Sequence, residues 1–233
     1  MSEPYVPADA LAARRKPLFP GESADYAAQR RSLLADEIDL RRHIARVAAR
    51  RRTLPDGPVV AKDYRFRDAN GGEVGLIDLF GPHSTLVTYF WMFGPKRARP
   101  CPMCTNFLGA LNGNAADIKQ KAALKILGRS PVERQVAFAL ERGWRDLDFV
   151  MTVGDDYARD IGVLTADDAE YPALVVFRRD SDKVWLFWAS EISGEMADPG
   201  QDPRGAPDLA PLWNILDLTP EGREPSWYPK LGY

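Results

Sequence analysis

The chain has 233 residues, of which 45% are hydrophobic, so it is long enough to bury one good core in one or two domains. Its 31 basic and 33 acidic residues nearly balance, which leaves no overall field to attract nucleic acid or an anionic membrane, and we expect neither partner. No stretch approaches a transmembrane span, and the N-terminus lacks the continuous apolar run of a secretory signal. We therefore expect a cytoplasmic protein.

The N-terminal part is predicted to be an arm and a helix. Residues 1–20 contain four prolines and no periodicity, whereas a long helix is expected from Ser23 to about Arg52. Its apolar residues recur with roughly helical spacing at Leu34, Ile38, Ile44 and Val47. The arginines and acids elsewhere on it are typical of a solvated face. We assign residues 1–58 to this part, and packing of the helix on a second subunit, as a homodimer, is one hypothesis for its role.

Residues 59–233 are predicted to form one α/β domain. Asn70-Gly71-Gly72 separates two alternating segments, which favours a hairpin over residues 62–80. A fully buried strand is expected next, from Leu86 to Phe93. Later segments predict, in order, a strand at Ala122–Gly128, a helix at Ser130–Arg142, a strand at Leu147–Val153, a short helix at Asp156–Gly162, two antiparallel strands after Pro172 and a closing helix at about Pro207–Leu218.

The only two cysteines lie in the motif CPMC, directly after a basic loop. Proline is best tolerated at the first helical position, so Pro102 there makes Cys101 the N-cap and places Cys104 about one turn inside the helix. Unpaired backbone N–H groups, the helix dipole and the cations Arg97 and Arg99 all favour a thiolate. Only the thiolate attacks a disulfide, so we predict Cys101 as the nucleophile and Cys104 as the resolving thiol.

Two neighbouring residues are candidate substrate contacts. Met103 lies between the cysteines, where it should be exposed, and Trp91 lies at the strand end nearest the dithiol. The cluster of Tyr89, Trp91 and Phe93 also has the composition of a core segment, which is the alternative for Trp91.

A metal site is the main alternative for a C-x-x-C motif. A structural zinc site needs four ligands, and the two further candidates of the usual kind, His43 and His83, have a spacing that fits no zinc finger. Haem attachment requires histidine after the second cysteine, where this chain has Thr105. We expect no metal and no separate cofactor, because the chain also lacks a phosphate-cradling glycine loop. Its electrons would come from a low-molecular-weight thiol or a protein reductant.

The order of elements resembles the thioredoxin fold, and the hairpin before the central strand resembles an elaboration found in peroxiredoxin-like members. More closely, FWMFGP followed by CPMC, the LNG after it and the ending ILDLTPEGR resemble a bacterial family of thioredoxin-like proteins, described as predicted dithiol–disulfide oxidoreductases of unknown function. The resemblance runs from the N-terminal helix to Arg223. It implies a central mixed sheet flanked by helices, with an N-terminal β-hairpin and a helical extension.

The resemblance also implies roles for individual residues. It makes Cys101 and Cys104 the redox pair, and Pro172 the candidate for the cis-proline that faces the dithiol and presents the backbone of Tyr171 to an incoming disulfide. An ordinary trans proline at the start of an edge strand is the alternative. Thioredoxin's buried acid has no counterpart in the strand before the motif, which leaves the proton acceptor of Cys104 open.

The sequence thus predicts a thiol–disulfide oxidoreductase, with two alternatives. For a thiol peroxidase, the peroxiredoxin pattern of proline and Thr or Ser before the reactive cysteine is absent: counting back from Cys101 gives Ala98 and Gly94, and from Cys104 gives Cys101 and Arg97. A non-enzymatic redox sensor or binding module is the other alternative, because fold alone does not fix function.

Overall fold

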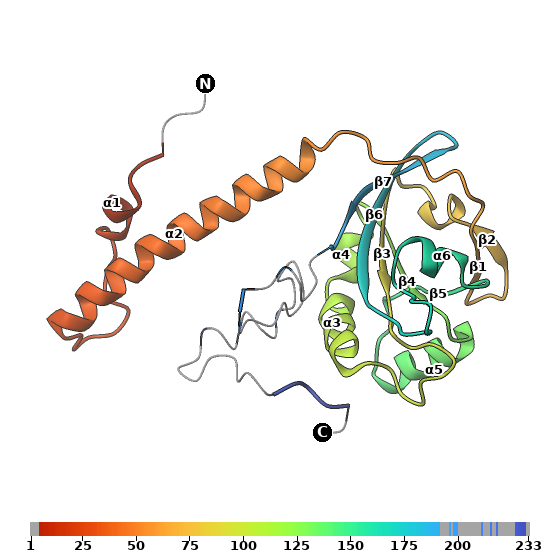
Figure 1. Ribbon diagram of the computed structural model, residues 1–233. Helices are drawn as coiled ribbons and strands as arrows, with labels where there is room; N and C mark the ends of the chain where they lie inside the picture. The colour runs from red at the N-terminus through yellow and green to blue at the C-terminus, as the bar shows by residue number, and fades with distance from the viewer. Residues whose placement is uncertain are drawn as a thin grey trace. The chain divides into compact units, whose positions relative to one another are not determined.

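The structure is a computed structural model that describes residues 5–191, 196, 198–199, 211, 215, 218 and 227–231 (Figure 1). The chain divides into two compact units, Met1–Pro55 and Asp56–Tyr233. The predicted closing helix at 207–218 lies mostly outside the described residues.

The first unit is helical in its described part, with α1 (Ala8–Ala12) and α2 (Ala24–Arg52). Helix α2 begins where a capping side chain is available, because the Ser23 hydroxyl accepts the N–H of Tyr26 at 3.1 Å. Its last turn is basic, which suits the negative end of the helix dipole. The predicted extent of the long helix is confirmed.

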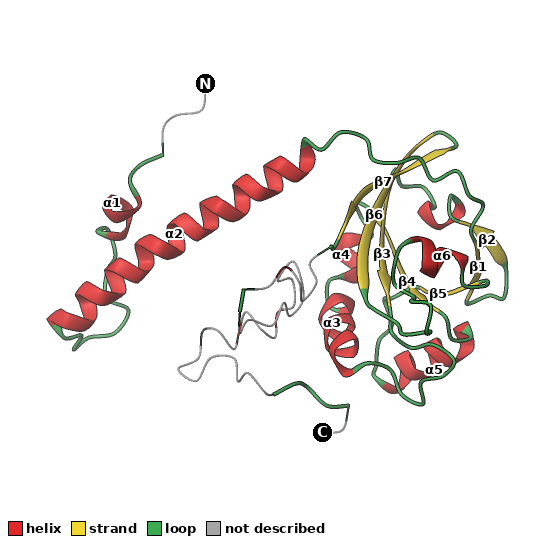
Figure 2. Cartoon of the chain, in the orientation of Figure 1, coloured by secondary structure: helices red, strands yellow, loops and turns green. Residues whose placement is uncertain are grey.

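The second unit is built on a seven-stranded mixed sheet in the order β2-β1-β5-β4-β3-β6-β7 (Figure 2). The strands are β1 (Arg65–Asp68), β2 (Glu73–Gly75), β3 (Thr85–Phe90), β4 (Ala123–Gly128), β5 (Phe149–Thr152), β6 (Ala173–Asp180) and β7 (Lys183–Ala189). Strands β3, β4 and β5 are parallel to one another, whereas β6 runs antiparallel to β3 and pairs with β7 as a hairpin. At the other side, β1 pairs antiparallel with both β5 and β2.

Helices cover both faces of this sheet. They are η1 (Asp78–Phe80), α3 (Pro102–Asn112), α4 (Ala115–Ile118), α5 (Val132–Glu141) and α6 (Asp156–Asp160). Side chains of β3 alternate between the faces: Leu86 and Phe90 join the core cluster that includes residues of η1 and α6, and Tyr89 joins the cluster that includes residues of α3, α4 and α5. The cysteine helix therefore packs on the Tyr89 face of the central strand.

These connections are those of a thioredoxin-like fold, so the predicted fold class is confirmed. Helix α3 links the parallel strands β3 and β4, and the antiparallel hairpin β6–β7 lies on the other side of β3. Two predicted boundaries are wrong. Strand β3 ends at Phe90 and not at Phe93, because the N–H of Phe93 bonds to the carbonyl of Trp91 in a tight turn. The hairpin does not extend to Phe80: the chain after Gly75 forms η1, because Asp78 accepts the Gly75 N–H at 2.7 Å.

Candidate active site

Cys101 is the N-cap of α3 and Pro102 is its first helical residue. The proline explains the local backbone, because a residue before proline is held extended, and Cys101 has φ −60° and ψ 126°. The N–H of Cys101 donates to the Met92 carbonyl at 3.1 Å, and its carbonyl accepts the N–H and the hydroxyl of Thr105 at 3.0 and 2.9 Å. These contacts fix Cys101 just beyond the end of β3.

Cys101 carries the more acidic thiol. The hydrogen bond from Cys104 is the largest cause that lowers the pKa of Cys101 to about 6; the backbone N–H groups of Cys104 and Met103 and the charge of Arg97 add to it, against partial burial. An ordinary cysteine is thiolate to a few per cent at pH 7, whereas a pKa of about 6 makes it roughly 90% thiolate. Cys101 is half-buried, in contrast to the buried Cys104.

Cys104 has the opposite character. It is 1% exposed, and burial, followed by the hydrogen bond to Cys101, raises its pKa well above the ordinary value. Both cysteines are free thiols, with Cys101 half-buried and Cys104 buried. The two thiols therefore differ in both burial and acidity, with the more acidic one on the more exposed residue.

Tyr89 lies against this pair from the central strand. Its ring packs on Phe107 of α3, with the ring centroids 4.7 Å apart, and its hydroxyl lies next to the thiol of Cys104, whose pKa it acts to lower. Burial and the adjacent Cys104 raise the pKa of Tyr89, so its hydroxyl stays protonated and can donate to that sulfur. Sequence reasoning assigned Tyr89 to the core; the available signal was a polar-tipped ring on the face of β3 that the cysteine helix covers.

A buried carboxylate, Glu170, fixes the loop between β3 and α3. Its side chain is 4% exposed, accepts the Gly94 N–H at 3.0 Å, and lies 3.4 Å from Nε of Arg97 and 3.3 Å from Nη1 of Arg129. Gly94 permits this approach, because a Cβ there would lie 2.1 Å from Oε1 of Glu170. Glu170 thus positions Arg97, the cation that acts on Cys101. Sequence reasoning missed this residue.

A cavity of about 310 Å³ adjoins the same loop. It is lined by Gly94, Lys96, Arg97, Arg129, Asp168, Ala169, Glu170 and Tyr171. Its cations are paired, since Lys96 contacts Asp168 at 2.6 Å and Arg129 also contacts Asp168 at 2.9 Å. The cavity brings together Arg97 and Tyr171, two of the residues singled out from the sequence.

The segment Tyr171-Pro172 lies at the sheet end nearest the dithiol. The next residue, Ala173, pairs with Phe90, the last residue of β3. Both Tyr171 and Pro172 are exposed, and the N–H of Tyr171 donates to the Val163 carbonyl at 2.8 Å. The two residues are therefore open to an incoming chain.

Trp91 is not a substrate contact, contrary to the prediction. Its side chain is fully buried, and its ring packs between residues of different elements, with centroid distances of 4.9 to 6.0 Å to Phe93, Phe138, Trp144 and Phe149. Trp91 is therefore part of the core, which was the alternative.

Of the remaining predicted residues, Met103 lies beside Cys101 and Arg99 does not. Met103 is half-buried and directs its backbone N–H at the Cys101 sulfur. Arg99 turns away from the dithiol: its Nη2 lies 3.4 Å from Glu141 and its guanidinium lies over the Phe138 ring. Of the two arginines, Arg97 is the one among the main causes of the low pKa of Cys101.

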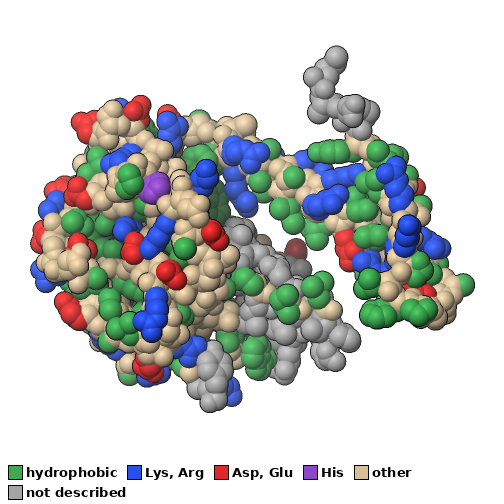
Figure 3. Space-filling model, turned by 180° about the vertical axis from the view of Figure 1, so that it is seen from behind, with side chains coloured by type: hydrophobic (Ala, Val, Ile, Leu, Met, Phe, Trp, Pro, Cys, Tyr) green, Lys and Arg blue, Asp and Glu red, His purple; other side chains and the backbone are tan. Residues whose placement is uncertain are grey.

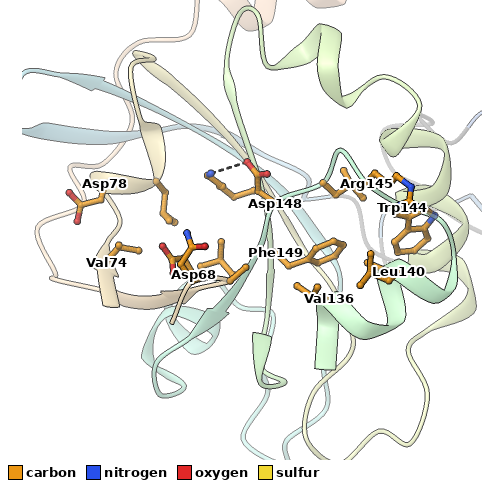
Figure 4. A pocket seen from close by; sticks show the side chains of 16 residues that line it. Asp68, Val74, Asp78, Val136, Leu140, Trp144, Arg145, Asp148 and Phe149 are labelled. Carbon is orange, nitrogen blue, oxygen red and sulfur yellow. Dashed lines mark hydrogen bonds and ion pairs between the residues drawn. The ribbon is translucent and has the colours of Figure 1, made fainter. Parts of the chain in front are cut away.

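A second cavity, of about 560 Å³, lies elsewhere in this unit, where the β1–β2 hairpin, β5 and α5 meet (Figure 4). Its lining includes Asp68, Trp144 and Phe149 but neither cysteine. Asp148, one of its acids, is paired with Lys125 at 3.0 Å and Lys119 at 2.8 Å. This cavity is separate from the dithiol site.

The residues that the structure describes contain no group of three or more His, Cys, Asp or Glu side chains arranged to hold a metal ion. None of the helices among them combines the length and apolar character needed to cross a bilayer.

Several solved structures are similar to this chain. They include a reduced 2-Cys peroxiredoxin from Plasmodium vivax (14% identity, 61% of this chain and 86% of that one, TM-score 0.42) and the exposed lipoprotein thioredoxin Etrx1 from Streptococcus pneumoniae (13% identity, 58% and 93%, TM-score 0.41). A third is a peroxiredoxin-like protein from Aquifex aeolicus (12% identity, 60% and 77%, TM-score 0.43). No curated protein matches the chain. Residues 16–233 match the family described as "Bacterial protein of unknown function (DUF899)", and the chain belongs to that family.

Proposed function

We propose that this protein is a thiol–disulfide oxidoreductase in which Cys101 and Cys104 form the redox pair. The observation that carries the proposal is the difference in burial and pKa between the two thiols. Cys101 is half-exposed with a pKa of about 6, and Cys104 is buried with a raised pKa. An attacking thiol is most effective when its pKa lies near ambient pH, and a resolving thiol is best kept from outside reagents.

The first step is attack on a substrate disulfide. The Cys101 thiolate forms a bond to one sulfur of the substrate, and the bond between the two substrate sulfurs breaks. The products are a mixed disulfide between Cys101 and the substrate and one released substrate thiolate. Exposed Tyr171-Pro172 and half-buried Met103 are the residues we assign to holding the substrate chain beside Cys101.

The second step is resolution by Cys104. Its thiol gives its proton to the thiolate released in the first step, and the resulting Cys104 thiolate attacks the Cys101 sulfur. The bond between Cys101 and the substrate breaks, and the second half of the substrate leaves as a thiolate, which takes a proton from water. Two electrons have then passed from the dithiol to the substrate, and the protein holds a Cys101–Cys104 disulfide. A low-molecular-weight thiol or a protein dithiol returns the pair to the reduced state by the same exchange in reverse.

The test compares the wild type with Cys101→Ser and Cys104→Ser in the reduction of a model disulfide and of insulin by dithiothreitol. We expect Cys101→Ser to abolish turnover, and Cys104→Ser to accumulate a one-to-one mixed disulfide detectable by intact mass spectrometry. Wild-type turnover no faster than that of Cys101→Ser would overturn the proposal. Peroxide consumption measured in parallel separates this function from a thiol peroxidase, which would reduce hydrogen peroxide faster than the disulfides.

A further inference from the structure

Helix α2 carries an apolar stripe on its surface. Tyr26, Leu33, Leu40 and Val47 follow one another at intervals of seven residues, and Ile44 lies one turn after Leu40. Seven residues are close to two helical turns, so these side chains share one face. The first three and Ile44 are 52 to 61% exposed, which is unusual for large hydrophobic side chains in such a regular array.

The N-terminal arm of the same unit uses a different side of the helix. The guanidinium of Arg42 donates to the Val6 carbonyl at 2.7 Å and lies over the Tyr5 ring, 4.9 Å from its centroid. Arg42 is two residues before Ile44, which is about 200° around an α-helix. The arm therefore leaves the stripe uncovered, and hydrophobic and basic side chains are visible on the surface of this unit (Figure 3).

The charges of α2 divide at the middle of the stripe. From Ala24 to Asp39 the helix has four acids and two arginines, whereas from Leu40 to Arg52 it has six arginines and no acid. Two such helices side by side in the same direction would bring their six-arginine halves together. In opposite directions, the basic half of each would face the acidic half of the other, which is electrostatically complementary.

We infer that two copies of this chain associate through the Tyr26–Val47 stripe of α2, with the two helices antiparallel. The apolar stripe supplies the buried surface, and the divided charge selects a second copy in the reversed direction. This inference is independent of the dithiol chemistry, because it rests on the first unit alone.

The test is the oligomeric state of the full-length reduced protein by sedimentation velocity and by light scattering after gel filtration. We expect a dimer, and we expect Leu33→Asp and Leu40→Asp to raise its dissociation constant by about 100-fold or more, because each places a charge in the apolar contact. Ser32→Asp is the matched control: it adds the same charge at the neighbouring exposed position, off the stripe, and should leave the dimer intact. Circular dichroism establishes that all three variants remain helical.

Salt dependence tests the direction of the helices. In the antiparallel arrangement, sodium chloride screens attraction and the dissociation constant rises with ionic strength, whereas in a parallel pair it screens repulsion and the constant falls. The inference is overturned if the wild type is monomeric up to about 100 μM, because specific dimers of standard interface size form in this range. A dimer that persists unchanged in Leu40→Asp, or that tightens with salt, overturns it as well.

Discussion

The hydroxyl of Tyr89 lies next to the buried thiol of Cys104, where it can donate a hydrogen bond to the sulfur. Tyr89 stays protonated because burial raises its pKa, so it donates to the sulfur and does not take up its proton. In the proposed mechanism, a donor placed there would stabilise negative charge on Cys104 when its thiolate forms. The strand before the motif has no acid, and this hydroxyl is the polar group that it supplies to the buried thiol.

Removing that hydroxyl is expected to slow resolution. A lost hydrogen bond to a charged group is worth about 1.5 kcal/mol, so Tyr89→Phe should slow the second step by roughly tenfold while leaving the attack of Cys101 nearly unchanged. Single-turnover reactions quenched with acid and analysed by mass spectrometry should show more mixed disulfide. Tyr157→Phe, which removes the hydroxyl of a tyrosine buried in the other cluster, serves as the control. Equal resolution rates in Tyr89→Phe and the wild type would contradict this role.

The attack rate should follow the ionisation of Cys101. Because the thiolate is the nucleophile, the rate is expected to rise from pH 5 and to level off above pH 7, with a midpoint near 6. Arg97→Gln removes a cation that favours the thiolate, so the midpoint moves upward and the rate at pH 6 falls about two- to threefold. Arg99→Gln is the matched control, because Arg99 contacts Glu141 instead. Equal midpoints for both variants would remove the assigned role of Arg97.

Glu170→Gln should shift the same midpoint in the opposite direction. The amide keeps the oxygen that accepts the Gly94 N–H, but the negative charge next to Arg97 is lost. A more positive surrounding favours the thiolate, so the pKa of Cys101 should fall. The absorbance of the thiolate at 240 nm, followed against pH, measures this directly. An upward midpoint would contradict this charge effect and would mean that the amide no longer holds Arg97 beside Cys101.

Gly94→Ala is expected to destabilise the fold. Its Cβ would collide with the Glu170 carboxylate, and displacing that buried group from its hydrogen bonds costs about 1 to 3 kcal/mol. The free energy of unfolding by urea provides the measurement. Gly113→Ala is the control, because a Cβ there lies 3.6 Å from the Ala110 carbonyl oxygen and its backbone is already helical. A loss of stability in Gly113→Ala as large as in Gly94→Ala would argue against the steric explanation.

Most elements of the fold could be predicted from local sequence patterns. Three such patterns each predict one element that the structure contains: the Asn70-Gly71-Gly72 turn, the run of β-branched and aromatic residues in β3, and the proline at the start of α3. The end of β3 was predicted too far along, because Trp91 and Phe93 are as apolar as the strand itself, and composition alone does not reveal the turn that follows.

Only the part of the site that is formed by residues adjacent in sequence could be predicted. The N-cap position of Cys101 follows from adjacent residues, whereas Glu170 reaches Gly94 from 76 positions away along the chain. A single sequence contains no signal for such a pairing. The burial of Trp91 likewise depends on Phe138, Trp144 and Phe149, which other elements bring to it.

Two prolines flank Cys101 and restrict the backbone of the motif. Cys101 stands between Pro100 and Pro102, and Pro100 is itself buried, so the backbone at the motif has little freedom left to lose when the four-residue ring closes. Ring closure is then fast relative to any second encounter, as expected for a reaction between groups held at high effective concentration. Covalent complexes with natural targets should therefore be too short-lived to isolate from cells with the unaltered protein, and should become abundant when Cys104 is replaced.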